Sequence, residues 1–395
     1  MTMTEARPAV RQLDDALLDR IRQRARGYDE SNQFFAEDFA ELVEAGYLRA
    51  AVPAELGGWG LSLTELAHQQ RRLARYAPAT ALATTMHHYW VGMAADLHRF
   101  GHPAAEAILA DVVDGDVYAA GHAESGNDVP VLMSTTTAER VEGGYRFTGR
   151  KHFTSLSPVW TRLGVHGLDA TSDPEHPVVV HGFVTRQSDD VQTIPVWDTL
   201  GMRATQSHDT DLRGVFVPDE RIGAVAPAGD SSDPFVGIMT VWALTLISNV
   251  YVGIAERAFE LATESATTKS AVSIPRGLYA TQPFIQHQIS EMYIDVHAAR
   301  ATVDSVTQDW SNGVDHGDEW GALVFSAKWR ASDAARRVVG LAMDVVGGGS
   351  FFRRGELERL YRDVRASAYH PPTDAFAHEA IAKIALGIDP AEPRF

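Results

Sequence analysis

Residues 144–151 read Gly144-Tyr145-Arg146-Phe147-Thr148-Gly149-Arg150-Lys151 and follow Glu142-Gly143 directly. The glycines mark a hairpin turn. On both sides of this stretch, between residues 117 and 218, short segments rich in β-branched residues alternate with Gly, Pro, Asp and Asn, which is typical of strands joined by turns. We expect strands at residues 131–141, 145–148, 163–167, 178–184, 191–196 and 212–217. A region of this kind predicts a compact β-barrel or sandwich.

Helical periodicity flanks this region on both sides. Before residue 117 the apolar residues recur at helical spacing, and Ser62 with Glu65 forms a capping box that begins one helix. After residue 234 we expect long helices at 235–270, 283–312, 316–346 and 354–386, which predict an antiparallel four-helix bundle. The fold class is therefore α+β. The expected domains are an N-terminal helical domain at 1–116, a central β-domain at 117–223 and a C-terminal helical bundle at 224–395.

Composition excludes several classes of function. The 395 residues contain no cysteine, which removes disulfides, thiolate nucleophiles, iron–sulfur clusters and cysteine zinc sites, and we predict no metal site. A formal net charge of -17 makes nucleic acid a poor partner. No run of about 18 apolar residues and no signal-like N-terminus are recognised, so we expect a soluble, cytoplasmic protein without membrane contact.

Several motifs occur in a characteristic order along the chain. They are residues 45–53 with Leu56-Gly57-Gly58, residues 120–129, residues 144–151, Leu200-Gly201-Met202-Arg203 with Phe216-Val217-Pro218, Gly347-Gly348, and Leu357-Glu358-Arg359-Leu360-Tyr361-Arg362-Asp363. Together with the order of helices, strands and helices, they resemble the acyl-CoA dehydrogenase superfamily across nearly the whole chain. The resemblance implies a flavin-dependent oxidoreductase whose flavin ring lies between the β-domain and the bundle.

Two segments are expected to contact the flavin ring. The first is residues 120–129, whose glycines and small donors suit close backbone approach to a planar ring. The second is residues 152–155, which would place the aromatic Phe153 beside the ring and the Ser155 hydroxyl near its reactive edge. The alternatives are a polar β-turn for the first segment and a strand end with Phe153 in the core for the second. The expected flavin contacts are Ala120, His122, Ser125, Gly126, Asn127, Phe153, Thr154 and Ser155.

The resemblance also implies that the pyrophosphate and adenosine of FAD are held by the bundle, partly from a neighbouring subunit. Gly347 and Gly348 would permit close backbone approach to the cofactor, and Arg276 would pair with its phosphate. The alternatives are a helix C-cap for the glycines and a solvated loop position for Arg276. Asp344 stands where the family usually has glutamine, and because a carboxylate is unfavourable near a pyrophosphate, FMN is the alternative cofactor. The residues expected here are Arg276, Phe284, Asp344, Gly347, Gly348 and Thr373.

The catalytic base of the dehydrogenases is missing. Most of the family carries a glutamate eight residues after the Arg-Asp pair, and this count from Asp363 arrives at Pro371. A minority places the glutamate on the first bundle helix, near residues 267–271, where no carboxylate is found and Glu264 is one turn early. His370, directly before Pro371, and Ser155 resemble residues of the two-component monooxygenases, in which a separate reductase supplies reduced flavin that reacts with O2. An unperturbed histidine pKa near 6.5 would allow His370 to deprotonate a substrate or to hold the reactive oxygen. The alternative for His370 is a partly buried histidine at a helix end.

The helix that contains residues 85–90 is the expected source of substrate contacts. In monooxygenase relatives this helix lines the cavity, so His88 and Trp90 are predicted to bind substrate. The alternative places Tyr89 and Trp90 in the core and exposes one of the adjacent histidines.

Three functions remain open. The leading hypothesis is a flavin-dependent monooxygenase that uses reduced flavin and O2 to hydroxylate an aromatic or polycyclic small molecule. The alternative is an acyl-CoA or acyl-carrier dehydrogenase with a displaced base. The third is a non-catalytic flavoprotein, which the cluster of arginines between residues 330 and 365 supports. Acidic residues interrupt this cluster, which favours a salt-bridged surface instead. The family also implies a homotetramer or a dimer.

Overall fold

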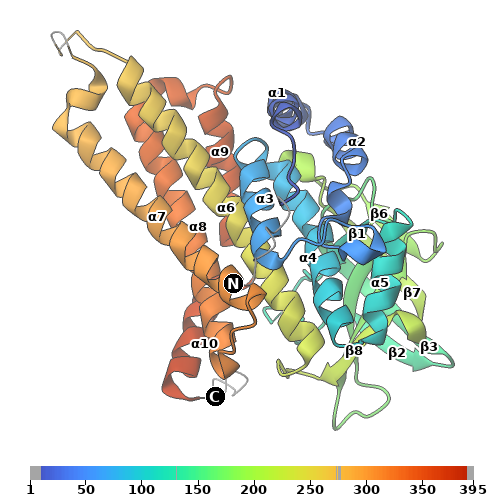
Figure 1. Cartoon of the computed structure of the whole chain (residues 1–395). Helices are drawn as coiled ribbons and strands as arrows, with labels where there is room; N and C mark the ends of the chain where they lie inside the picture. The colour runs from blue at the N-terminus through green and yellow to red at the C-terminus, as the bar shows by residue number, and fades with distance from the viewer. Residues whose placement is uncertain (1–9, 130, 273, 275–276, 389–395) are drawn as a thin grey trace, which may run out of the picture.

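The computed structural model describes residues 10–129, 131–272, 274 and 277–388, and its elements follow one another as helices, strands and helices (Figure 1). The N-terminal helices are α1 (Asp15–Ser31), α2 (Ala36–Glu44), α3 (Leu63–Ala74), α4 (Pro78–Arg99) and α5 (Pro103–Val113). The predicted capping box is confirmed, because Ser62 and Glu65 hydrogen-bond to each other's backbone at the start of α3.

Eight strands form one mixed sheet. They are β1 (Tyr118–Gly121), β2 (Thr137–Val141), β3 (Gly144–Thr154), β4 (Arg162–Asp169), β5 (Val178–Thr185), β6 (Val191–Ile194), β7 (His208–Pro218) and β8 (Ile222–Pro227). The order is β6-β7-β3-β2-β4-β5-β8, and β1 pairs with β4 in parallel. The sheet curls back on itself, since a Cβ on Gly182 of β5 would lie 3.2 Å from Val217 of β7. This curvature fits the predicted barrel or sandwich.

The expected strands differ from the observed ones chiefly at β1, at β8 and at the start of β2. Strands β1 and β8 are not among the expected segments. Strand β8 also crosses residue 223, the expected end of the β-domain. The expectation of a strand from residue 131 is wrong, because β2 begins only at Thr137. The Glu124 side chain accepts hydrogen bonds from the backbone of Thr135 and Thr136, which replaces strand pairing in this loop.

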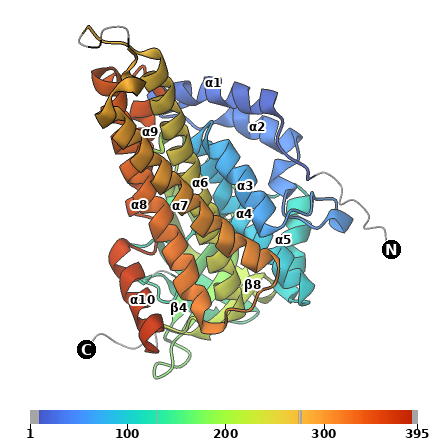
Figure 2. The same ribbon diagram turned by 60° about the vertical axis from the view of Figure 1, so that its left-hand side comes forward.

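Three long helices run side by side in both views (Figures 1 and 2): α6 (Pro234–Thr268), α7 (Pro283–Ser311) and α8 (Trp320–Val346). The expected fourth long helix is wrong. It is divided into α9 (Glu356–Val364) and α10 (Asp374–Leu386). Pro371 and Pro372 lack the N–H groups that a continuous helix needs, and Thr373 caps the new helix by accepting from Phe376 N.

Helix α6 corrects the expectation that the chain has no long apolar run. It is the one helix among the described residues that is long and apolar enough to span a membrane, but 83% of its most apolar window is buried inside the fold. It packs closely on α4, where a side chain at Gly92 would overlap the Trp242 ring. Helix α6 is therefore the core helix of a soluble protein.

Candidate functional site

The two segments expected to contact a flavin ring meet at the end of β3. His152 N donates to Ala123 O at 2.8 Å, and the His152 Nε2 atom lies 2.9 Å from Ser125 Oγ. On its other side the His152 ring lies 3.0 Å from the Asp209 carboxylate. Residues more than 25 positions apart in the sequence are thus joined at one edge of the sheet.

The loop after β1 is held from inside by a buried ion pair. Lys151 Nζ lies 2.5 Å from Glu124 Oε1, and both side chains are fully buried. Burial alone would raise the pKa of Glu124, but the Lys151 ammonium and hydrogen bonds from Thr136 and Ser134 outweigh it and lower this pKa to about 2. Asn127 donates to Glu124 and to Met133 O. The Asn127 amide therefore shapes the loop from within.

The remaining expected residues of this loop lie at its two sides. Ala120 is buried in β1 opposite Gly164, and Gly126 adopts a φ of 78°, which favours glycine. The His122 ring lies 3.3 Å from His166. Burial lowers the pKa of His122 to about 3, so this ring is neutral at pH 7.

Phe153 is turned outward at the meeting point of the two segments. Its side chain is 60% exposed, and its φ of 57° is unusual for a bulky residue. The Trp197 ring meets it edge-on, with ring centroids 6.0 Å apart. The alternative that placed Phe153 in the core is wrong. A strained backbone that exposes an aromatic face beside a second aromatic is typical of a binding surface.

Ser155 lies behind Phe153 in a row of hydroxyl groups. Its Oγ is 2.8 Å from Ser207 Oγ, which is 2.7 Å from Thr205 Oγ1. Thr154 is fully buried and accepts from Thr210. Thr205 in turn donates to Met202 O. Ser155 is thus oriented by a hydrogen-bonded row that no spacing in the sequence reveals.

This row continues to the C-terminal helices. Met202 N donates to Asp363 Oδ1 of α9 at 2.5 Å, and Gly201 permits the approach, because a Cβ there would overlap the backbone of Arg362. The segment that follows α9 carries His370. The Ser155 side of the site is therefore fixed to the element that leads to His370, although no hydrogen bond between the two residues is found in the described part of the chain.

The half-buried His370 ring is hydrogen-bonded to the side chain of Tyr251. The Tyr251 oxygen lies 2.7 Å from His370 Nδ1. Burial raises the pKa of Tyr251 well above its usual range, so its O–H stays protonated. Burial, with a contribution from Lys328, lowers the pKa of His370 to about 4. His370 is therefore neutral at pH 7, with one ring nitrogen that donates and one that accepts, and it is a weak base.

Both histidines of α4 are buried, so the alternative is wrong where it exposes one of them and right where it places Tyr89 and Trp90 in the core. His87 bonds Leu48 O and accepts from Tyr118 N. Neither ring nitrogen of His88 has a partner among the described residues, and its ring meets Tyr47 edge-on at 4.6 Å. The Tyr89 hydroxyl is also buried without a partner in the described chain. A buried polar group normally has a partner, so His88 and Tyr89 mark a polar internal position.

Trp90 is a core residue in this structure. Its Nε1 donates to Ala119 O at 3.0 Å, and its ring occupies the space that a side chain at Gly164 would need. It packs on Phe183 and His122. This arrangement fixes α4 against β1 and β4 and gives no support to Trp90 as a substrate contact.

The residues expected to hold the adenosine half of FAD lie apart from Phe153. Phe284 is 65% exposed at the start of α7, at the upper end of the bundle in Figure 1, and Asp344 and Gly348 are exposed at the end of α8. Gly347 ends α8 with a φ of 74°, as a C-cap glycine does. Thr373 is the N-cap of α10, and Arg276 lies outside the described residues.

Sequence comparisons identify the family. The acyl-CoA dehydrogenase N-terminal domain profile matches residues 4–116, and the C-terminal domain profile matches residues 245–385. A putative acyl-CoA dehydrogenase, YdbM of Bacillus subtilis, is 30% identical over 374 residues, which cover 93% of this chain and 94% of that protein. The chain belongs to the acyl-CoA dehydrogenase family. Its predicted fold class is confirmed.

Other relatives are oxygenating enzymes. The dibenzothiophene monooxygenase of Mycolicibacterium goodii is 27% identical over 87% of this chain and 86% of its own length. The structure of KijD3 in complex with FMN and a dTDP-linked amino sugar superposes with a TM-score of 0.83 at 25% identity, covering 95% of this chain and 92% of that one. The predictions of a flavin-dependent oxidoreductase and of a flavin cofactor are confirmed.

The residues at the end of β3 suit a flavin ring. Phe153 and Trp197 offer an exposed aromatic corner, and the loop beside them is preformed by Glu124 and Lys151. Bound flavin would supply electron transfer there, while the chain would supply the aromatic contact and fixed hydrogen-bond donors. No group of His, Asp or Glu within the described residues could hold a metal ion.

We expect Phe153→Ala to weaken flavin binding about tenfold, because an aromatic pair contributes roughly 1 kcal/mol beyond its buried area. The exposed side chain contributes little to the fold, so the melting temperature should hardly change. Flavin fluorescence titration measures the effect, and Phe100→Ala is the matched control, since Phe100 is 79% exposed at the far end of α4. Equal affinities in wild type and Phe153→Ala would remove Phe153 from the flavin site.

Proposed function

We propose that this chain is a flavin-dependent monooxygenase, which uses reduced flavin and O2 to hydroxylate an aromatic or polycyclic small molecule. The observation that carries the proposal is the neutral His370–Tyr251 pair, next to the proline that stands where most dehydrogenases of the family have their base. Reduced flavin supplies two electrons, so that one oxygen atom of O2 enters the substrate and the other leaves as water.

The chain is proposed to supply hydrogen-bond donors from His370 and Ser155. In the proposed arrangement Tyr251, whose oxygen lies 2.7 Å from Nδ1, donates to that atom and keeps the proton of His370 on Nε2. The Nε2–H group can then hold an oxygen atom by a hydrogen bond without the need to ionise. Ser155, held by Ser207, is proposed to offer a second hydroxyl to the flavin. Neutral donors that are fixed in advance favour oxygen transfer over removal of a carbon-bound proton.

The substrate is proposed to carry a polar group on an otherwise apolar body. His88 and Tyr89 have buried polar atoms without partners in the described chain, and a substrate with a hydroxyl, amine or heteroatom would satisfy them. Relatives include a dibenzothiophene monooxygenase and an L-evernosamine nitrososynthase of Micromonospora. Both names indicate oxidation at or beside a heteroatom.

FMN is proposed to be a sufficient cofactor. Asp344, Gly348 and Phe284 lie exposed away from Phe153 in the single chain, so a second subunit would be needed to hold an adenosine half. The relative KijD3 has a structure with FMN. Parallel titrations with FMN and FAD test this: comparable dissociation constants support it, and FAD binding more than about tenfold tighter contradicts it, since that is about 1.4 kcal/mol.

The competing function is an acyl-CoA dehydrogenase, which the likeness to YdbM favours. Its displaced base would be Glu264, but this residue is exposed on α6. We expect no anaerobic bleaching of bound flavin by an acyl-CoA, and Glu264→Gln should leave substrate-dependent oxygen consumption unchanged. Rapid bleaching that Glu264→Gln abolishes would establish dehydrogenation in place of oxygenation.

Two partners complete the proposal: a separate flavin reductase and further copies of this chain. Large apolar side chains are exposed on α7 and beside the end of α8, namely Phe284, Tyr293, Ile294, Phe351 and Phe352, and such exposure on helices of a bundle favours self-association. We expect light scattering to give a mass of two or four chains of 43.1 kDa. A mass of one chain would contradict this. A cytoplasmic location is part of the same proposal.

A further inference from the structure

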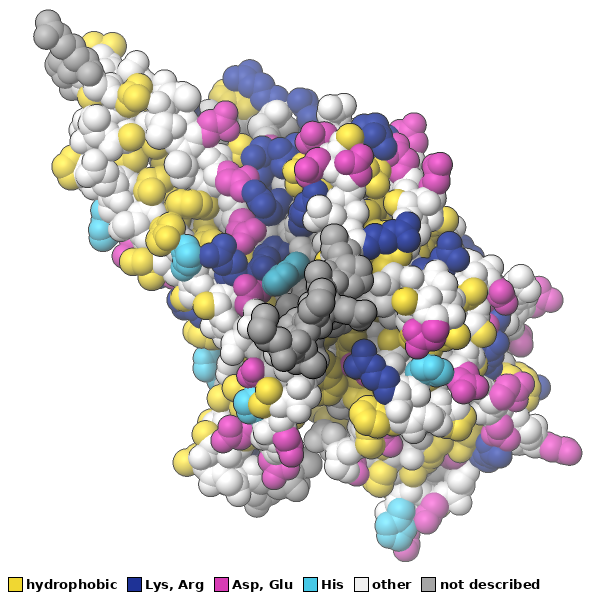
Figure 3. Space-filling view, viewed as in Figure 1, with side chains coloured by type: hydrophobic (Ala, Val, Ile, Leu, Met, Phe, Trp, Pro, Cys, Tyr) yellow, Lys and Arg dark blue, Asp and Glu magenta, His cyan; other side chains and the backbone are white. Residues whose placement is uncertain are grey.

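A cavity lies between α1 and the start of α9, outside the proposed flavin site. Its volume is about 220 Å³, and one water needs only about 10–15 Å³ on this measure, so the cavity has room for a ligand of several atoms. Figure 3 shows Lys and Arg side chains gathered over this part of the surface. The lining residues are Arg22, Gln23, Arg26, Asp29, Arg353, Arg354, Gly355, Glu356, Glu358 and Arg359.

The acidic residues of this cavity are already paired with arginines from outside its lining. Arg362 binds Asp29 at 2.7 Å and Glu358 at 2.8 Å. Arg257 binds Glu356 at 2.8 Å. These three carboxylates therefore form their ion pairs with arginines that do not line the cavity.

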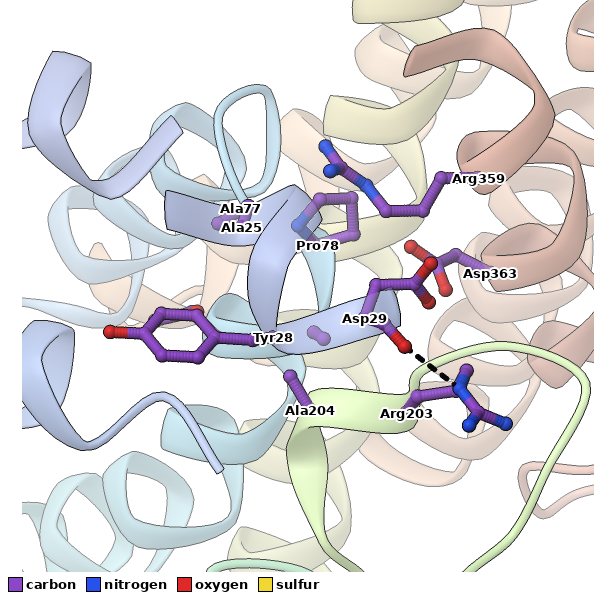
Figure 4. A pocket seen from close by; sticks show the side chains of 11 residues that line it. Ala25, Tyr28, Asp29, Ala77, Pro78, Arg203, Ala204, Arg359 and Asp363 are labelled. Atoms are coloured by element: carbon purple, nitrogen blue, oxygen red, sulfur yellow. Dashed lines mark hydrogen bonds between the residues drawn. The ribbon is translucent and has the colours of Figure 1, made fainter. Parts of the chain in front are cut away.

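Several of the lining arginines form no ion pair with a described residue. Arg359 is only 7% exposed and forms no hydrogen bond or ion pair in the described part of the chain, although its charge stabilises the ionised form of the buried Asp363 carboxylate. In Figure 4 its guanidinium lies beside Pro78 and the Asp363 carboxylate lies below its side chain. Arg353 and Arg354 are exposed without an ion pair to any described residue. Arg22 has a buried Nε without a partner there, but its guanidinium donates to Arg75 O and lies over the Tyr76 ring, and Arg26 is paired with Glu30. A buried guanidinium without an anion is costly.

The start of α9 adds to this positive field. Gly355 is the N-cap of this nine-residue helix and supplies no side-chain acceptor, so the N–H groups of the first turn need other acceptors. Glu356 and Glu358 in the same turn offset part of the helix dipole. The other arginines expected to form a surface cluster behave differently. Arg330, Arg336 and Arg337 are each paired with a carboxylate. Within the expected cluster, the cavity-lining Arg353, Arg354 and Arg359 form no ion pair with a described residue, and neither does Arg365, which lies outside the lining.

We propose that this cavity binds a phosphate or pyrophosphate group. Guanidinium groups that reach one space from α1 and from the start of α9 suit a tetrahedral, doubly charged anion, because its oxygens accept from several directions, whereas a single carboxylate satisfies one planar fork. The formal charge of the chain is -17, so a free anion is repelled elsewhere, and a local cluster of unpaired arginines is selective for it. The cavity holds the phosphate groups, and any attached nucleoside lies outside it.

Isothermal titration of the full-length protein with inorganic pyrophosphate tests the proposal, without flavin or substrate. Arg359→Gln should weaken binding about tenfold or more, as expected for a charge-assisted hydrogen bond. Because the buried Arg359 also contributes to the fold, the exposed pair Arg353→Gln/Arg354→Gln provides an independent test with the same expected direction. Arg213→Gln is the matched control, since Arg213 is 56% exposed on β7 and does not line the cavity; its affinity should stay within about twofold, since that is under 0.5 kcal/mol.

Further titrations identify the source of the anion. Phosphate, pyrophosphate, ADP and UDP are compared: tighter binding of both nucleotides than of pyrophosphate assigns the cavity to a nucleoside diphosphate, and tighter binding of pyrophosphate alone assigns it to the inorganic anion. Binding should weaken as salt is raised. The proposal is overturned if wild type binds none of these at millimolar concentration, if citrate binds more tightly than all of them, or if Arg213→Gln weakens binding as much as the cavity variants. None of these readouts depends on oxygenation.

Discussion

Replacing His370 by alanine is expected to lower the rate of substrate oxygenation by a factor of about 10²–10³, the usual cost of removing one fixed donor. Flavin affinity should stay close to that of the wild type, because Phe153 and its neighbours are untouched. Product formation with a reductase and NADH measures the rate. His378→Ala is the matched control, since His378 is exposed on α10, and it should keep full activity.

Tyr251→Phe separates the role of the hydrogen bond from that of the ring. Without the Tyr251 donor, the His370 proton is no longer held on Nε2, and we expect a loss of about tenfold, which is the net value of one such bond. Full activity of both His370→Ala and Tyr251→Phe would show that the pair takes no part in the reaction.

The same assignment fixes the pH dependence. Burial lowers the pKa of His370 to about 4, so the ring is neutral from pH 8 down to about pH 5 and becomes charged only below that. We expect a rate without an inflection near pH 6.5, where an unperturbed histidine would titrate. A clear loss of rate between pH 7 and pH 6 that Tyr251→Phe or His370→Ala removes would contradict a neutral donor.

The second large effect is expected at the buried ion pair. Glu124→Gln leaves the fully buried Lys151 ammonium without its counter-charge, and loss of one partner of such a pair costs about 3–5 kcal/mol of unfolding free energy. Urea unfolding measures it. Glu124→Gln/Lys151→Met removes both charges and should recover part of the stability. Unchanged stability in the single variant would show that the pair does not hold the loop.

This pair also predicts how stability depends on acid. The pKa of Glu124 in the folded protein, about 2, lies below its usual value of about 4.3 in an unfolded chain. Its stabilising contribution is therefore complete above pH 4.3 and is lost as the pH falls toward 2. The loop that Glu124 organises carries Ser125 and Gly126, so the single variant should also bind flavin more weakly.

Sequence patterns predicted the fold well where they depend on local chemistry. The hairpin at Glu142-Gly143-Gly144 and the capping box at Ser62 have direct local signals, and both are observed. Strand β1 carries only four residues, too few for a period to be visible. Pro371 and Pro372 indicate the break between α9 and α10, but the helical pattern on both sides led to the expectation of one continuous helix.

The candidate site was harder to predict because its contacts are distant in the sequence. His370 is identified by its place after the Arg-Asp pair, whereas Tyr251 lies 119 residues away with no local signal of that contact. The same holds for Ser207 beside Ser155 and for Trp197 beside Phe153. The expectation for His370 as a base changes for a related reason: burial, which lowers its pKa, cannot be inferred from the sequence.

Isotope labelling tests the central proposal most directly. The protein is supplied with enzymatically reduced FMN and oxygen-18-labelled O2 in unlabelled water, together with a panel of aromatic and heteroatom-containing small molecules, and the products are analysed by mass spectrometry. The proposed function predicts a product that carries one labelled oxygen atom, formed only when reduced flavin is present and strongly diminished in His370→Ala. An oxidised product without label, or turnover of an acyl-CoA in the absence of O2, would contradict it.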